Sequence, residues 1–237
     1  MDSFDILLLI ARPAAGKSEV INYLKKTALT ERKKRFHIGN FVELDDFPML
    51  WTWFEEDALL DKMGHPRLHT TPDGYFKETY LWDLLIERIC LEYEKLMRDF
   101  HGDTVIIEFS RGTEHGGYQR AFAHLSEAIL GRLAILHIDV SWEESLRKNR
   151  KRFNPERPDS ILEHGLPDHK LEKMYHFSDW HTLSQGGPNK IKIQGIDVPY
   201  VNFDNADDVT TTQGPELGQR LEAALSNLWR IYLIQRK

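Results

Sequence analysis

The chain has 237 residues, of which 41% are hydrophobic and 29% are charged, and its formal net charge is −6. This composition is typical of a folded globular protein and excludes an intrinsically disordered one. The acidic balance argues against a general nucleic-acid-binding role, which usually requires an excess of Lys and Arg. Because Cys90 is the only cysteine, no disulfide can form within the chain, and this favours a reducing compartment.

The first residues, MDSFDILLLIARP, begin with acidic side chains and contain only a short apolar run. A secretory signal begins with basic residues, and a membrane-spanning helix needs about 20 consecutive apolar residues. We therefore expect a cytoplasmic protein without a membrane partner. The sequence leaves the oligomeric state open.

Apolar runs typical of buried parallel strands alternate with segments of helical periodicity along the chain. The expected strands are Asp5–Ile10, Thr104–Phe109, Arg132–Val140, Val198–Phe203 and a less regular Phe36–Leu44. The expected helices are Ser18–Thr27, Phe76–Met97, Gly117–Leu130, Glu143–Arg152 and Pro215–Tyr232. This alternation predicts an α/β fold, a three-layer α/β/α domain around a mostly parallel five-stranded sheet, with residues 1–237 as one domain.

Two long segments do not follow this alternation. Phe47–Asp73 is rich in aromatic residues and turn formers, and Asn154–Gln194 is rich in His, Pro and Gly. Long connections in compact domains often serve as lids or binding loops. We therefore interpret 47–73 as an insertion beside the site of the acceptor substrate, and 145–194 as a lid with an insertion.

The first expected strand leads into ARPAAGKS, Ala11–Ser18, and a helical pattern follows at once. This octapeptide is a relaxed form of the phosphate-binding loop, with Ala11 in the place of the first glycine. Gly16 allows the main chain to curl so that its N–H groups point at an anion, which the N-terminus of the following helix also attracts. Lys17 supplies a positive charge for the β- and γ-phosphates, and the Ser18 hydroxyl can join a Mg²⁺ shell. The predicted phosphate site consists of Pro13, Ala14, Ala15, Gly16, Lys17 and Ser18.

The loop and its strand–helix context resemble the P-loop NTPase superfamily, and the size and strand–helix count resemble its nucleoside and nucleotide kinases. This resemblance covers most of the first 155 residues and the last expected strand. It implies a kinase that uses ATP and Mg²⁺ and moves the γ-phosphoryl group to a small-molecule acceptor, a nucleoside or a nucleotide. Ala11 departs from the pattern, which has glycine at this place. If the backbone there has a positive φ, a non-glycine residue would be strained.

A second charged cluster follows the expected strand Thr104–Phe109, which ends in Glu108 and continues to Arg111. Ligands of doubly wound sheets lie beyond the carboxyl ends of the strands, so Glu108 would lie beside the phosphate loop if the two strands are neighbours. Glu108 could hold Mg²⁺ or take a proton from an attacking hydroxyl, and Arg111 could hold an acidic group of the substrate. Deoxynucleoside kinases carry Glu-Arg-Ser at this strand end and adenylate-kinase-like enzymes carry Asp-Gly-Phe-Pro-Arg. Both are similar in part to this stretch, which leaves the acceptor open.

Asp45 and Asp46 follow the less regular strand. In related small-molecule kinases an acidic residue of this region contacts or deprotonates the acceptor hydroxyl. An Asp before a helix also commonly caps backbone N–H groups, and the spacing does not choose between these roles, nor between the aspartates and Glu108 as base. Arg67, in GHPRLH, is a further candidate for an acidic group of the acceptor.

A basic segment, SWEESLRKNRKRFNPERP, follows the fourth expected strand of an otherwise acidic protein. By its place in the strand order it resembles the arginine-bearing lid of nucleoside and nucleotide kinases. The resemblance implies that Arg147 and Arg150 stabilise the transferred phosphoryl group and that Arg152 contacts the nucleotide. A solvated basic helix or a small nucleic-acid patch is the alternative.

The leading interpretation is therefore an ATP-dependent phosphotransferase in which positioning and charge carry the rate. A non-catalytic or regulatory nucleotide-binding module is one alternative. A polynucleotide-end kinase is another, supported by the basic lid and opposed by the net negative charge.

Overall fold

The computed structural model describes residues 2–99, 102–152, 156 and 165–235. Its strands are β1 (Ile6–Ala11), β2 (Phe41–Asp45), β3 (Thr104–Phe109), β4 (Leu133–Asp139), β5 (Lys190–Ile193) and β6 (Ile196–Asp204). They form one sheet in the order β2-β3-β1-β4-β6-β5. Five of them run parallel, and β5 pairs antiparallel with β6 at the edge. The prediction of five strands is therefore corrected to six.

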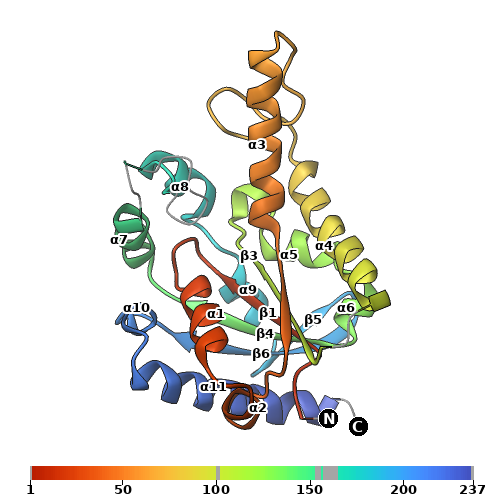
Figure 1. Cartoon of the computed structure of the whole chain (residues 1–237), viewed down its shortest axis with the longest axis vertical. Coiled ribbons are helices and arrows are strands. Elements are labelled where there is room, and N and C mark those ends of the chain that lie inside the picture. Colours follow the sequence, from red (N-terminus) through yellow and green to blue (C-terminus); the bar gives the residue numbers. More distant parts are fainter. Residues whose placement is uncertain (1, 100–101, 153–155, 157–164, 236–237) are drawn as a thin grey trace.

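Helices cover both faces of the sheet, so the predicted three-layer α/β/α architecture is confirmed (Figure 1). One face packs on α1 (Lys17–Lys26), α2 (Leu29–Phe36) and α11 (Pro215–Gln235). The other face packs on α4 (Tyr80–Asp99), α5 (Gly117–Ala123), α6 (Glu127–Leu130) and α9 (Trp180–Ser184). In β1, Leu7 and Leu9 enter the first core and Ile6 and Leu8 the second. A strand buried on both faces has a continuous apolar sequence, which explains why β1 could be predicted.

The remaining helices lie near the carboxyl ends of the parallel strands. They are α3 (Asp46–Lys62), the short 3₁₀ turn η1 (Thr113–His115), α7 (Trp142–Arg152), α8 (Asp168–Tyr175) and α10 (Val209–Thr212). Figure 1 shows α3 rising away from the sheet, with α7 and α8 beside its base. Within the described ranges, no helix combines the length and the apolar character that a membrane-spanning segment requires.

The segment 47–73, interpreted from the sequence as an acceptor-side insertion, is helical over most of its length. The Asp45 carboxylate caps the N-terminus of α3 by accepting a hydrogen bond of 2.9 Å from the Phe47 N–H. Pro48 lies in the first turn, where the missing N–H has no intrahelical partner to lose. Trp53 is buried against α4, whereas Leu59, nearer the tip, is 56% exposed.

Three other boundaries differ from the prediction. The expected strand Phe36–Leu44 is wrong in its first half, because Phe36 ends α2 and His37 has a φ of +55°. The expected helix Gly117–Leu130 is broken into α5 and α6. The strand β5 was missed because its four residues, KIKI, hold only two apolar side chains.

Candidate functional site

The loop Ala11–Ser18 joins β1 to α1, as predicted. Gly16 has a φ of +111°, and a Cβ there would lie 2.5 Å from Thr210 Oγ1, so no other residue fits without displacing its neighbour. Ala11 is an extended residue paired with Ile138 of β4, so it carries none of the strain that a positive φ would bring. The strained alanine is Ala14, with a φ of +56°, a conformation that costs a non-glycine residue about 1–2 kcal/mol.

Buried side chains from distant elements hold the carbonyl groups of this loop. Tyr118 donates to the Ala11 carbonyl at 3.0 Å, Ser145 to Pro13 at 2.8 Å, and Asn205 to Ala15 at 2.8 Å. The first N–H groups of α1 have no carbonyl one turn earlier within the helix. With three of its carbonyl groups held by distant side chains, the loop ends at a helix N-terminus, a place where proteins commonly bind anions. Sequence reasoning missed these three side chains, because each is more than 100 residues from its partner and belongs to no motif.

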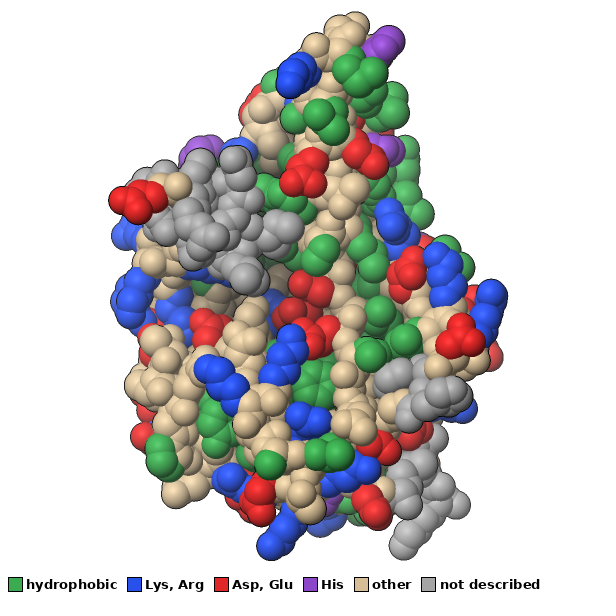
Figure 2. Space-filling view, in the orientation of Figure 1, with side chains coloured by type: hydrophobic (Ala, Val, Ile, Leu, Met, Phe, Trp, Pro, Cys, Tyr) green, Lys and Arg blue, Asp and Glu red, His purple; other side chains and the backbone are tan. Residues whose placement is uncertain are grey.

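Two cavities meet at the loop. The acidic cavity, about 360 Å³, is named for its carboxylate lining of Glu43, Asp45, Asp46 and Glu108. The basic cavity, about 380 Å³, is named for its cationic lining of Lys148, Lys151 and Arg152 beside the loop. Both are lined by Ala14, Lys17, Ser18, Asn22 and Arg152. Figure 2 shows acidic side chains gathered at the foot of α3 with basic ones below them. The acidic cavity is also lined by Lys25 and Arg111, and the basic cavity by Glu19 and Asp208, so Lys17 lies where two cavities of mixed charge meet.

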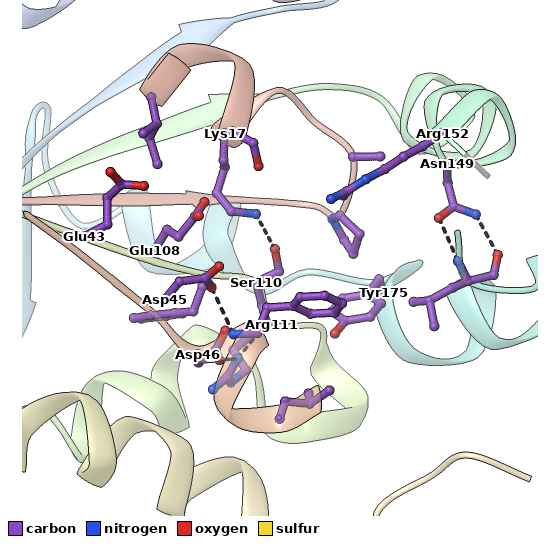
Figure 3. A pocket seen from close by; sticks show the side chains of 18 of the residues that line it. Lys17, Glu43, Asp45, Asp46, Glu108, Ser110, Arg111, Asn149, Arg152 and Tyr175 are labelled. Carbon is purple, nitrogen blue, oxygen red and sulfur yellow. Dashed lines mark hydrogen bonds and ion pairs between the residues drawn. The ribbon is translucent and has the colours of Figure 1, made fainter. Parts of the chain in front are cut away.

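A pair of carboxyl groups dominates the acidic cavity (Figure 3). Asp45 and Glu108 are direct partners in the pairing of β2 with β3 and share a hydrogen bond. Burial, followed by the neighbouring charge of Glu108, raises the pKa of Asp45 to about 8. Burial also raises the pKa of Glu108, while the Lys17 ammonium group opposes this rise. At pH 7 Asp45 is therefore protonated and can donate the hydrogen bond that it shares with Glu108.

Lys17 and Arg111 approach this pair from opposite sides in Figure 3. Lys17 Nζ donates to Ser110 Oγ at 2.8 Å. Arg111 forms an ion pair of 2.6 Å with Asp46, and the two side chains are only 2% and 8% exposed. The Arg111 guanidinium also lies 5.1 Å from the centre of the Trp82 ring. Asp46 and Arg111 are therefore both in the cavity wall, but each neutralises the other.

Of the basic residues on α7, those that line the cavities differ in part from the ones that the sequence spacing predicted. Arg147 pairs with Glu144 and Asp208 and is 50% exposed, Arg150 pairs with Asp168 and is 62% exposed, and neither lines either cavity. The buried Lys148 lines the basic cavity and pairs with Asp208 at 2.7 Å. Arg152, also chosen from the sequence, lines both cavities. Residues 153–155 and 157–164 of the predicted lid lie outside the described residues.

Arg67 is not brought to the site. Its guanidinium pairs with Asp61 at 2.6 Å and donates to Thr70 Oγ1 at 2.7 Å, in the loop that follows α3. It lines neither cavity.

No family model matches the chain, and no curated protein matches it significantly. Among solved structures it is similar to an unliganded sugar kinase from Janibacter sp. HTCC2649, with 14% identity, a TM-score of 0.43, and coverage of 94% of this chain and 93% of that chain. It is similar to the tunicamycin resistance protein of Deinococcus radiodurans, with 11% identity, a TM-score of 0.37, and coverage of 90% and 96%. A Thermus thermophilus protein gives 15% identity, a TM-score of 0.39, and coverage of 95% and 98%. At these TM-scores the likeness carries no weight for function, which has to come from the site itself.

Proposed function

We propose that the protein is an ATP-dependent phosphotransferase that moves the γ-phosphoryl group to a hydroxyl of a small-molecule acceptor of the nucleoside or nucleotide type. The observation that carries the proposal is the position of Lys17. It lies in a loop built to receive an anion, between a basic cavity suited to a triphosphate and an acidic cavity that holds a carboxyl pair. Phosphoryl transfer needs little covalent help from the protein, so positioning and charge of this kind are what the reaction requires.

On the donor side, the loop amides and Lys17 receive the β- and γ-phosphates, while Lys148, Lys151 and Arg152 line the space for the rest of the triphosphate. Mg²⁺ prefers oxygen ligands and usually keeps several waters, so the Ser18 hydroxyl would supply one ligand and the Glu108 carboxylate would hold the ion through a water. These two residues would hold the ion, which would neutralise charge on the phosphate oxygens. In this proposal Arg152 lies beside the triphosphate, where the sequence spacing had favoured Arg147 and Arg150.

On the acceptor side, the Glu108 carboxylate receives the proton of the attacking hydroxyl. The acceptor oxygen forms a bond to the γ-phosphorus as the bond from that phosphorus to the β,γ-bridging oxygen breaks, and ADP leaves with that oxygen. Asp45 holds Glu108 in place through the hydrogen bond that they share. Lys17 stabilises the charge that develops on the transferred group.

The test is a screen of hydroxyl compounds, nucleosides, nucleotides and 5′-hydroxyl oligonucleotides with ATP and Mg²⁺, read as ADP release, with Lys17→Ala as the control. ADP release that depends on one acceptor and is lost in Lys17→Ala supports the proposal. Tight ATP binding without turnover across the panel would favour a regulatory nucleotide-binding module instead. Transfer to oligonucleotides that weakens steeply with salt would favour a polynucleotide-end kinase.

A further inference from the structure

The charges that line the acidic cavity bear on which acceptor it can receive. We propose that the acceptor is an uncharged hydroxyl compound and that phosphate esters, nucleotides included, are excluded from this cavity. The proposal deepens the proposed function and rests on it, because it assigns the acidic cavity to the acceptor and the basic cavity to the triphosphate.

Two of the four cationic residues that line the acidic cavity are already paired with its carboxylates. Lys25 Nζ lies 2.8 Å from Glu43 at the rim, and Arg111 lies 2.6 Å from Asp46 in the wall. These two pairs leave no net charge.

The other two cationic residues belong to the donor side. Lys17 and Arg152 also line the basic cavity, where the triphosphate engages them in the proposed function. Among the described residues, the acceptor side therefore retains no further Lys or Arg side chain, only the carboxyl groups of Asp45 and Glu108.

A phosphate ester would bring about one and a half to two further negative charges into this space. Proteins hold such a group with Arg or Lys side chains whose charge is available, usually in a forked pair of hydrogen bonds. The arginine within reach, Arg111, would have to leave Asp46, which is 5% exposed and would remain as an uncompensated buried charge.

An uncharged hydroxyl compound meets neither obstacle. Its hydroxyl groups can donate hydrogen bonds to the carboxyl pair, and its apolar parts can pack against the half-buried Phe47 and Leu50 and the rings of Trp82 and Tyr175. Apolar and aromatic side chains beside polar groups that fix the orientation of the ligand are the usual lining of a small-molecule site.

The first test uses inorganic phosphate as the probe and the full chain saturated with Mg²⁺ and a non-hydrolysable ATP analogue. Calorimetric titration of phosphate into this complex should give no saturable binding below about 10 mM. A saturable phosphate site in this complex would overturn the proposal. Failure of the ATP analogue to bind, which is measured before any phosphate is added, would instead refute the proposed function.

The second test releases the Arg111 charge. In the same complex, Asp46→Asn should gain a phosphate site of millimolar affinity. The double variant Asp46→Asn/Arg111→Met should lack this site. The control Asp197→Asn makes an equal charge change at the exposed pair with Lys192 and should gain no phosphate site. If Asp46→Asn binds no more phosphate than the unaltered chain, the ion pair is not what excludes phosphate and the proposal is wrong. Circular dichroism and thermal melting confirm that each variant is folded before titration.

A third measurement uses the acceptor screen. Each uncharged compound that reacts should exceed its own phosphate ester in kcat/KM by about tenfold or more. An ester that reacts as well as its parent would contradict the proposal while leaving the phosphotransferase activity intact.

Discussion

Asp45 and Glu108 lie directly opposite each other in the parallel pairing of β2 with β3, so their carboxyl groups meet at the carboxyl end of the sheet. On the other side of Glu108, Leu9 of β1 is its partner, two residues before the loop Ala11–Ser18 begins. The strand order therefore places the carboxyl pair beside the loop Ala11–Ser18 without the help of any flexible segment. A site built on adjacent strands holds its groups in fixed relative positions, which phosphoryl transfer requires.

Replacement of Lys17 by Ala should lower kcat/KM for ATP by about 100-fold or more, because it removes a charge that stabilises the transferred group. The fold should persist, since Lys17 is half-buried at a cavity junction and not in either core. The measurement is ADP release with the acceptor found in the screen, alongside thermal melting. Lys26→Ala, on the exposed side of the same helix, is the matched control and should retain full activity.

Glu108→Gln keeps the shape of the side chain and removes its basicity. We expect turnover to fall by about 10²- to 10⁴-fold, and by more than the affinity for ATP, because Glu108 acts as the base for the acceptor hydroxyl. Rapid-mix kinetics and calorimetry with an ATP analogue separate the two quantities. An unchanged turnover number in Glu108→Gln, together with a loss in Asp45→Asn, would move the base to Asp45.

Gly16→Ala should destabilise the loop and abolish nucleotide binding. The added Cβ would lie 2.5 Å from Thr210 Oγ1 and would sit at a φ of +111°, where side chains are strained. Gly214→Ala is the control, because a Cβ there meets no atom within 4 Å. The measurements are thermal melting and titration with an ATP analogue. Normal binding of the analogue by Gly16→Ala would contradict the prediction and show that the loop can accommodate a side chain at position 16.

Asp57 fixes the loop that returns from the tip of α3. Burial alone would raise its pKa, but hydrogen bonds from the Thr70 hydroxyl and from the N–H groups of Leu68, Thr70 and His69 outweigh this and lower the pKa to about 2. Because the folded pKa lies below the unfolded value of about 3.9, the stabilisation is complete above pH 4 and is lost as the pH falls through about 2.

Asp57→Asn should therefore cost about 1–3 kcal/mol locally at neutral pH. The readout is the hydrogen-exchange protection of the Leu68 and Thr70 amides, which should fall by about tenfold for each 1.4 kcal/mol. The difference from the unaltered chain should shrink towards pH 2. Asp61→Asn, which removes a half-exposed partner of Arg67, is the control and should change protection far less. Equal protection in Asp57→Asn would contradict the anchoring role.

The strands β1 and β3 and the loop Ala11–Ser18 could be predicted because a strand buried on both faces has an unbroken apolar sequence and because the loop needs particular residues at fixed spacing. α3 could not be predicted in the same way. It leaves the sheet, so Trp53 is buried at its base while Leu59 is exposed nearer its tip, and no single apolar stripe results. A periodic apolar stripe marks a helix that packs against the protein along its whole length, and α3 does not pack in this way.

The residues of the site divide in a similar way. Lys17, Asp45 and Glu108 follow from strand ends and a motif, whereas the choice among the basic residues of α7 depends on which face of the helix meets the loop. Asp208 binds the buried Lys148 and also holds Arg147 at the surface. That contact spans about 60 residues of sequence, and no local pattern reveals it.

Calorimetric titration of Mg²⁺ and a non-hydrolysable ATP analogue into the unaltered chain and into Lys17→Ala tests most directly whether the loop Ala11–Ser18 grips a triphosphate. We expect saturable association at one site in the unaltered chain and its loss in Lys17→Ala. No heat of association at millimolar ligand in the unaltered chain, or equal affinity in both proteins, would show that Lys17 and the loop amides do not form a nucleotide site.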